Sequence, residues 1–409
     1  MAVTDARLRG GDAEPKVSLL YNPALRSYAY QAITIIVIVW AVWYAWTNAA
    51  ANLARANMQA GFGFLNSRAG FDIAQTLISY SSDSTYFRAL EVGLLNTLVI
   101  AFFGVITATI VGLLVGIGRL SPNWLISRLC TVYVEIFRNI PPLLVIFFWY
   151  LGVLALLPTI RSILQGLKPA VGQDPVAVPS FFISNRGIYM PAPIAGEGFG
   201  IVVAAFITGI VLAIIFTIWA NRRQLATGKR PPVLWVNLAL IVLFPMVIFF
   251  VVGRPLTLDY AVPGAFNLKG GMVIGPEFLA LYLALSLYTA AFIAEIVRAG
   301  IRGVSKGQSE AAYALGIRPG LTTRLVVLPQ ALRIIIPPLT SQYLNLIKNS
   351  SLAVAVGYAD LVAVGGTILN QSGKSIEIIS IWMLIYVSIS LTTSLFMNWF
   401  NAKMALVER

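Results

Sequence analysis

The chain has 409 residues, of which 58% are hydrophobic and only 11% are charged, and its mean hydropathy is +0.82. Soluble domains carry about 25% charged residues, so a chain of this composition must expose most of its exterior to lipid. It has no histidine and one cysteine, Cys130, which excludes Ser-His and Cys-His nucleophiles, most metal sites and a disulfide framework. The net charge of +13 fits the Lys and Arg excess of cytoplasmic loops in membrane proteins better than a nucleic-acid surface.

Long apolar segments recur along the whole chain. A membrane-spanning helix needs about 20 mostly apolar residues. Eight segments meet this requirement: 27–47, 92–118, 140–157, 199–220, 233–252, 277–296, 334–356 and 376–400. We therefore predict an all-α integral membrane protein with about eight transmembrane helices.

Lys and Arg alternate in number between successive loops. If the N-terminus is cytoplasmic, the inner loops and tails hold roughly twice as many Lys and Arg as the outer ones, which predicts that both termini are cytoplasmic. The first span is expected to be retained rather than cleaved as a signal sequence, because Trp40, Trp43 and Trp46 are typical of a membrane interface. On this topology, 48–91 and 158–198 are large outer loops.

The inner loop between the sixth and seventh spans predicts a separate short helix. Ser305 and Gln308 have the spacing of a capping box, which would begin the helix. Gly316 can end it in a left-handed turn, and Pro319 prevents its return. We expect about ten residues of helix outside the membrane, with Glu310 as its one carboxylate.

The spacing of this loop resembles a known signature. The order is Glu310-Ala311-Ala312, three residues, Gly316, nine residues, then Val326-Val327-Leu328-Pro329. It is similar to the EAA signature of type I ABC importer permeases. The resemblance implies that the helix docks into a groove of a cytosolic ATPase, and that the coupling residues are Glu310, Ala311, Ala312, Leu315 and Gly316. The alternative is a surface helix that only links two spans.

Further blocks resemble the polar amino-acid permeases of the same family. They lie at 95–98, 137–145, 294–298, 328–331 and 348–353. The longer layout is similar to the longer permease of general L-amino-acid importers of the Aap/Bzt type. The resemblance implies a five-helix permease core, made by spans 2, 3, 6, 7 and 8, with three additional spans. It divides the chain into a cytoplasmic tail (1–26), an extra span and loop (27–87), a first core part (88–157), inserted loops and two extra spans (158–275), and a second core part (276–409) that includes the coupling loop (301–322).

The same resemblance implies the function and the partners. The chain would be the permease of an importer that moves L-amino acids across the bacterial inner membrane, together with a second, unlike permease, two ATPase subunits and a periplasmic amino-acid-binding protein. ATP and Mg²⁺ would bind to the ATPase, so no cofactor, metal or catalytic residue is expected in this lipid-embedded chain, and no nucleic acid. The alternative is a self-contained secondary transporter or channel driven by an ion gradient, which would favour interrupted spans and acidic ion sites.

Polar residues within the spans are candidates for the substrate path. Lys348 could attract an amino-acid carboxylate, or it could snorkel outward as a packing residue. Glu295 precedes Arg298 by three residues, which favours a local ion pair, and Asn96 could bond between helices. The full set of candidates is Lys348, Asn345, Asn349, Gln342, Ser350, Asn96 and Glu295.

Overall fold

The computed structural model describes residues 23–55, 61–166, 180–229, 231–263 and 268–404. Seven of its helices are long and apolar enough to cross a membrane. An eighth crossing arises if Pro319–Val356 and Leu361–Ser372, which are bent by 53° relative to each other, form one broken span. The predicted helical membrane protein of about eight spans is confirmed.

The spans differ in regularity. Five of them are single helices: α1 (Pro23–Arg55), α2 (Tyr86–Gly118), α6 (Phe199–Thr227), α9 (Pro276–Arg302) and α14 (Ser375–Met404). The third and fifth spans are composite. The third consists of α4 (Pro142–Phe147), η3 (Phe148–Val153), η4 (Leu154–Leu156) and α5 (Ile160–Gly166), and the fifth consists of α7 (Val233–Leu238), η5 (Ala239–Leu243) and α8 (Phe244–Val251). The broken seventh span contains α11 (Pro319–Thr322), η6 (Thr323–Val327), α12 (Leu328–Asn349), η7 (Ser350–Val356) and α13 (Leu361–Ser372).

Helices α2 and α9 form the centre of the bundle, and glycines let them approach closely. A Cβ atom at Gly112 would lie 2.6 Å from the Ile293 side chain, and one at Gly116 would lie 2.7 Å from the Ala294 carbonyl oxygen. The core around this contact includes Ile100, Leu285 and Ile293, all of them buried. Small residues at a spacing of four allow such close helix contacts in membranes, where packing rather than the hydrophobic effect drives association.

Helices α3 (Trp124–Asn139), α5 and α13 were not predicted, and α3 is the longest of them. Helix α3 begins where the Asn123 Oδ1 atom accepts hydrogen bonds from the Leu125 and Ile126 amides. It carries Arg128, Glu135 and Arg138, and these charges made its sequence too polar to be recognised as a span. Beyond Asn139, Ile140 and Pro141 separate it from the third span, which begins at Pro142.

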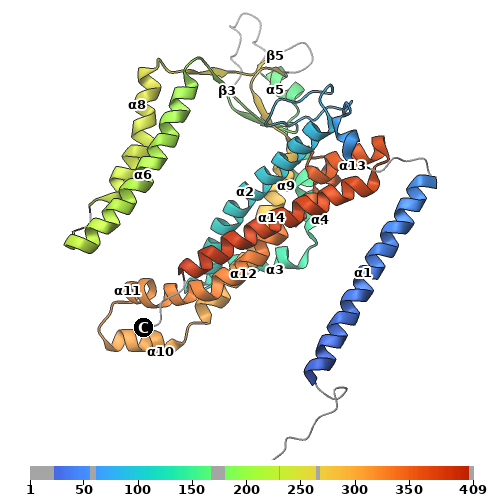
Figure 1. Ribbon diagram of the computed structural model, residues 1–409. Helices are drawn as coiled ribbons and strands as arrows, with labels where there is room; N and C mark the ends of the chain where they lie inside the picture. Colours follow the sequence, from blue (N-terminus) through green and yellow to red (C-terminus); the bar gives the residue numbers. More distant parts are fainter. Residues whose placement is uncertain (1–22, 56–60, 167–179, 230, 264–267, 405–409) are drawn as a thin grey trace, which may run out of the picture.

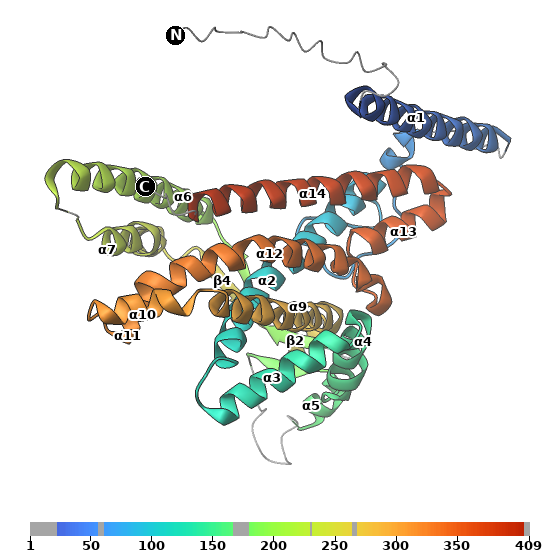
Figure 2. The same cartoon turned by 90° about the horizontal axis from the view of Figure 1, so that it is seen from below.

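Helices α6, α7 and α8 form a hairpin that stands apart from the bundle (Figures 1 and 2). Ala205, Gly209 and Ala213 are buried at a spacing of four along α6, and a Cβ atom at Gly209 would clash with the Leu240 carbonyl. The Asn237 amide donates a 2.8 Å hydrogen bond to the Thr217 Oγ1 atom across the same contact. The hairpin is therefore packed internally, while apolar side chains on its other faces are left exposed by the described part of the chain.

Short strands lie in the loops at one end of the molecule (Figure 1). Strands β1 (Phe182–Ser184), β2 (Gly187–Met190) and β7 (Met272–Ile274) form an antiparallel sheet, with Phe182 opposite Tyr189 and Tyr189 opposite Val273. Two further pairs are β3 (Ala192–Ala195) with β4 (Leu256–Asp259), and β5 (Val262–Pro263) with β6 (Leu268–Lys269). A 3-10 turn, η2 (Phe62–Asn66), lies in the first large loop. The strands are too short to give an alternating sequence pattern, and none was predicted.

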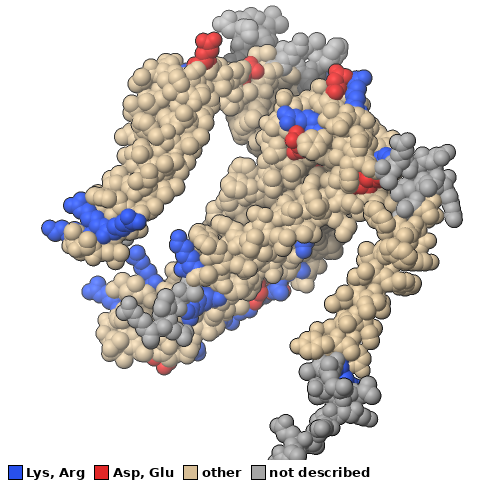
Figure 3. All heavy atoms as spheres, viewed as in Figure 1, with Lys and Arg blue, Asp and Glu red and all other residues tan. Residues whose placement is uncertain are grey.

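Charge is distributed unevenly along the helix axes. Lys and Arg gather at the end that carries the short helix α10 (Lys306–Ala314) and the end of α6, whereas carboxylates are more frequent at the end with the strands (Figure 3). Helix α1 begins, and α14 ends, toward the end that carries α10 (Figure 1).

Candidate functional site

Helix α10 projects from the bundle and exposes most of its side chains. Glu310, Ala311 and Gly316 are exposed, and the Leu315 side chain is 79% exposed. Ala312 is buried and faces the rest of the chain. Of the five predicted coupling residues, the structure therefore turns four outward and one inward. Together they present one carboxylate beside an apolar surface.

The structure confirms the predicted C-terminal end of α10 but not the capping predicted at its N-terminal end. At the C-terminal end Gly316 has φ +73, the Ile317 amide bonds the Ala312 carbonyl (3.1 Å) and the Gly316 amide bonds the Tyr313 carbonyl (2.9 Å). The predicted left-handed ending is confirmed. At the N-terminal end Ser305 occupies the capping position, but its side chain accepts no capping hydrogen bond. The predicted capping box is wrong, because the Gln308 side chain bonds a neighbouring helix.

Helix α10 is attached to the beginning of the seventh span. The Gln330 side chain of α12 donates a 3.3 Å hydrogen bond to the Gln308 Oε1 atom. The buried Thr322 hydroxyl bonds the Ile317 and Arg318 carbonyls at 3.4 and 3.2 Å and so holds the turn between α10 and α11. A displacement of α10 would therefore act first on α12.

Helix α12 carries a polar stripe that the described residues of the chain leave uncovered. Ser341, Asn345 and Lys348 are exposed at spacings of four and three residues, and Gln342 and Asn349 beside them are half-buried. The opposite side is packed into the core through Ile335, Leu339 and Leu346. Among the residues that the structure describes, the Lys348 ammonium has no hydrogen-bond or ion-pair partner.

Ser341 is a member of this stripe that the sequence reasoning missed. A serine is common in apolar spans, so by itself it gave no signal. The spacing of Ser341, Asn345 and Lys348 on one helical face could have identified it.

Two other candidates lie away from the stripe. The Ser350 side chain is buried and donates a 2.7 Å hydrogen bond to the Ile347 carbonyl. Asn96 is 3% exposed, and its amide donates to the carbonyls of Gln75 (3.0 Å) and Ala359 (2.9 Å). Asn96 thus ties α2 to an outer loop and to the break between α12 and α13, which leaves neither amide hydrogen free for a substrate.

Glu295 forms ion pairs rather than facing the stripe. Its carboxylate binds the guanidinium of Arg298, as the spacing predicted, and also that of Arg119 at the end of α2. A third guanidinium, that of Arg138, lies 3.9 Å away. Arg119 was not predicted as a partner of Glu295. It is remote in sequence, and the apolar sequence of α2 was not used to predict which side of that helix faces α9.

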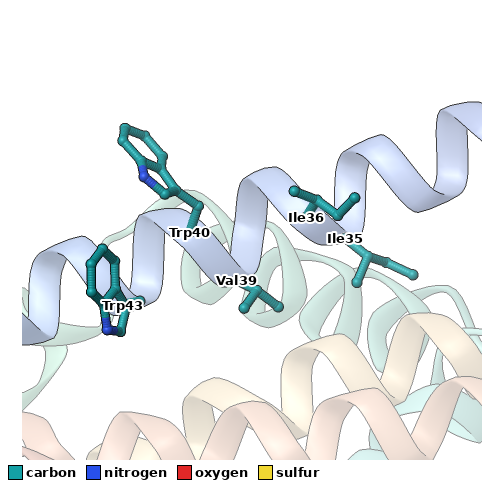
Figure 4. A pocket seen from close by; sticks show the side chains of 5 residues that line it. All are labelled: Ile35, Ile36, Val39, Trp40 and Trp43. Carbon is teal, nitrogen blue, oxygen red and sulfur yellow. The ribbon is translucent and has the colours of Figure 1, made fainter.

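No metal-binding group was found in the described part of the chain, where no three His, Cys, Asp or Glu side chains gather. An apolar hollow lies on α1, lined by Ile35, Ile36, Val39, Trp40 and Trp43 (Figure 4). It is a groove on the outside of a helix whose span is not buried by any other part of the described chain. Such a surface suits lipid chains rather than a polar substrate.

Comparison with known proteins gives the family. Residues 226–406 match the family described as binding-protein-dependent transport system inner membrane component. The general L-amino acid transport system permease protein AapQ of Rhizobium johnstonii is 62% identical over 393 residues, which cover 96% of this chain and 95% of that protein. The putative amino-acid ABC transporter permease protein YhdX of Escherichia coli is 46% identical over 95% of this chain and 96% of its own length.

A third relative agrees with these two. The glutamate/glutamine/aspartate/asparagine transport system permease protein BztB of Rhodobacter capsulatus is 44% identical over 416 aligned residues, which cover 96% of each chain. These alignments include the α6–α8 hairpin and the outer strands as well as the bundle. The chain belongs to the binding-protein-dependent inner membrane components, as a polar amino-acid ABC transporter permease of the Aap/Bzt type.

Proposed function

We propose that this chain is the membrane-spanning subunit of an importer that carries L-amino acids into the cytoplasm, and that a separate subunit hydrolyses the ATP. The observation that carries the proposal is α10, an exposed helix attached to the span that bears the polar stripe. The names of the relatives, which are amino-acid transport permeases, support the substrate class.

The exposed surface of α10 is suited to a protein partner. Glu310 is exposed beside Tyr313 and Leu315, and this helix lies outside the bundle. Exposed apolar side chains around one charge are typical of a contact surface, and a charge at such a contact fixes the orientation of the partner. We infer that α10 enters a groove of the ATPase through Glu310, Ala311, Leu315 and Gly316, while Ala312 holds it to the permease.

Movement of α10 would reach the polar stripe through α12. Gln308 and Gln330 link α10 to the first turn of α12, and the same helix continues to Lys348. Between these points Pro337 and Pro338 lie inside the helix. Proline removes a backbone donor and bends a helix, so α12 can change its curvature when α10 is displaced.

The polar stripe is proposed to line the substrate path. An unpaired polar or charged side chain is expensive in hydrocarbon and usually faces protein or water. Ser341, Asn345 and Lys348 are exposed in the part of the chain that the structure describes, so we infer that they face a second permease across a water-filled path. The Lys348 ammonium would attract the carboxylate that all free L-amino acids share.

The rest of the assembly follows from this arrangement. The proposed complex has an unlike second permease, two ATPase subunits that bind ATP and Mg²⁺, and a periplasmic binding protein that delivers the amino acid; this chain binds no cofactor. The end that carries α10 and most Lys and Arg would lie in the cytoplasm, with both termini, and the chain would reside in the bacterial inner membrane.

The test is ATP-driven uptake by the reconstituted complex. The chain is purified with its copurifying subunits, placed in liposomes with ATP and Mg²⁺ inside, and supplied from outside with binding protein and radiolabelled L-glutamine. We expect the ATPase to copurify and uptake to stop when ATP is omitted or when the ATPase is stripped off. Uptake by this chain alone, driven by a Na⁺ or proton gradient, would overturn the proposal in favour of a secondary transporter.

A further inference from the structure

Five charged side chains from three helices meet near the proposed inner end of the bundle. Arg119 ends α2, Glu135 and Arg138 lie on α3, and Glu295 and Arg298 lie on α9. We call these five residues the inner charge cluster. They are distinct from the exposed surface of α10 and from the polar stripe of α12.

Arg119 is the most buried member of the inner charge cluster and lies between two carboxylates. Its side chain is 9% exposed; it contacts the Glu295 carboxylate through Nη1 and lies 3.7 Å from the Glu135 carboxylate through Nη2. Its Nε atom is buried and has no hydrogen-bond partner in the described part of the chain. Arg119 therefore has more donor capacity than the present arrangement uses.

Glu295 is the anionic centre of the inner charge cluster. Its side chain is 23% exposed and is paired with Arg119 and Arg298, while Arg138 lies 3.9 Å from it and stacks over the Phe292 ring at 5.8 Å. Three cations and two carboxylates give the cluster a formal charge of +1. Removing the Glu295 charge would leave three guanidinium groups close together with only Glu135 to balance them, and the buried Arg119 could not recover its hydration.

The position of the inner charge cluster relates it to α10. Helix α9 ends at Arg302, and α10 begins at Lys306. On its other side α9 packs closely on α12, because a Cβ atom at Gly300 would clash with Ile335. Helix α3 leads through Pro141 into the third span. The cluster therefore lies where the helix before α10 meets α2 and α3.

We propose that the inner charge cluster is the joint through which movement of α10 and α9 is passed to α2, α3 and the third span, with Glu295 and Arg119 as its positioning residues. Arg119 contacts carboxylates on two different helices at once, more closely that of Glu295. We infer that the joint takes two arrangements: the present one, centred on Glu295, and another centred on Glu135. A small sliding of α9 against α3 would exchange them. An element with two discrete arrangements is what carries coupling between distant sites. This inference rests on the proposed function.

The test compares matched charge removals in the reconstituted complex. Glu295→Gln keeps the shape of the side chain and removes its charge. Glu91→Gln makes the same change at the opposite end of α2, where Glu91 pairs with Arg88 at 2.9 Å and both are half-exposed. The measured quantity is L-glutamine taken up per ATP hydrolysed, together with the stimulation of ATP hydrolysis by loaded binding protein.

We expect Glu295→Gln to lower uptake per ATP at least about 10-fold and to abolish the stimulation, while Glu91→Gln leaves both unchanged. Glu135→Gln should act in the same direction but less strongly, because it removes only the second arrangement. Should Glu295→Gln fail to assemble, Glu295→Asp keeps the charge on a shorter side chain and is expected to assemble with partial loss of coupling.

A structural role would give another result. The inference would be overturned if both variants gave less complex but the assembled complex, with Glu295→Asp or with Glu295→Gln, kept normal uptake per ATP. The unmodified complex separates failure of this inference from failure of the proposed function. If uptake by the unmodified complex does not depend on ATP, the proposed function itself is wrong.

Discussion

Lys348 lies exposed near the end of α12, on the same face as Ser341 and Asn345. A packing residue would be covered by its own chain, and a snorkelling one would be surrounded by apolar neighbours on its face. Instead, this face of α12 is apolar at Ile334 and Pro338 and becomes polar in the stripe that ends at Lys348. This gradient favours contact with a polar partner or with water.

Replacing Lys348 tests that contact. Lys348→Met keeps the aliphatic stem and loses the charge, so we expect the affinity for L-glutamine to fall by about 10- to 100-fold, corresponding to a charge-assisted contact of about 1.5–3 kcal/mol. Lys348→Arg should retain most of the affinity. The measurement is the substrate dependence of ATP-driven uptake. Equal uptake by all three forms at limiting substrate would assign Lys348 to the lipid interface.

At this scale the sequence indicated which residues were unusual but not what they touch. Lys348 was recognised because charges are rare within spans, and Glu310 because of the EAA-like spacing of its loop. Glu295 was recognised for the same reason as Lys348, and Asn96 as a polar residue within a span, yet their partners Arg119 and Ala359 are far away in sequence. Side-chain partners of this kind depend on how the helices are rotated against each other, and that is set by packing.

The contact between α2 and α9 is the main packing element of the bundle. Gly112 and Gly116 form a Gly-x-x-x-Gly pattern in α2. This pattern is typical of close helix contacts in membranes and could have been used to predict the α2 face that meets α9. Helix α3 could not be predicted as easily, because it is too polar for a span and the block at 137–145 covers only its last residues.

Gly112→Ala tests the close approach. The added Cβ atom would lie 2.6 Å from Ile293 and 2.9 Å from the Ala290 carbonyl. Overpacking of this kind typically costs about 1–3 kcal/mol, so we expect a lower thermal midpoint of the detergent-solubilised protein. The control is Gly200→Ala at the start of α6, where an added Cβ meets nothing within 4 Å. An unchanged midpoint for Gly112→Ala would show that the two helices separate without cost.

The whole molecule has a basic end with α10 and an opposite end with short strands (Figures 1 and 3). Span number and helical class followed from hydropathy, since lipid requires every backbone group to be satisfied within helices. The strands lie in the loops between spans, where hydropathy carries no such constraint. Two of the pairs, β2 with β7 and β3 with β4, join different loops, so they depend on how the loops meet.

Cysteine labelling tests the orientation of these two ends. In a Cys130→Ser background, Arg186→Cys in the turn between β1 and β2 and Gln224→Cys near the end of α6 both place the thiol at an exposed position. We expect an impermeant thiol reagent to label position 186 from outside and position 224 only after the membrane is opened. The reverse pattern would contradict the proposed topology.

The role of α10 is the central claim, and Glu310→Lys tests it most directly. A substitution at an exposed residue changes the stability of its own chain by only about 0.5 kcal/mol, whereas placing two like charges opposite each other at an interface costs several kcal/mol.

The matched control is Glu197→Lys, the same reversal at an exposed residue between β3 and α6. The measurement is ATP-driven L-glutamine uptake by equal amounts of reconstituted complex, with copurified ATPase as the second readout. We predict that Glu310→Lys inserts normally but loses uptake and captures less ATPase, while Glu197→Lys behaves as the unmodified chain. Normal uptake by Glu310→Lys would contradict the account.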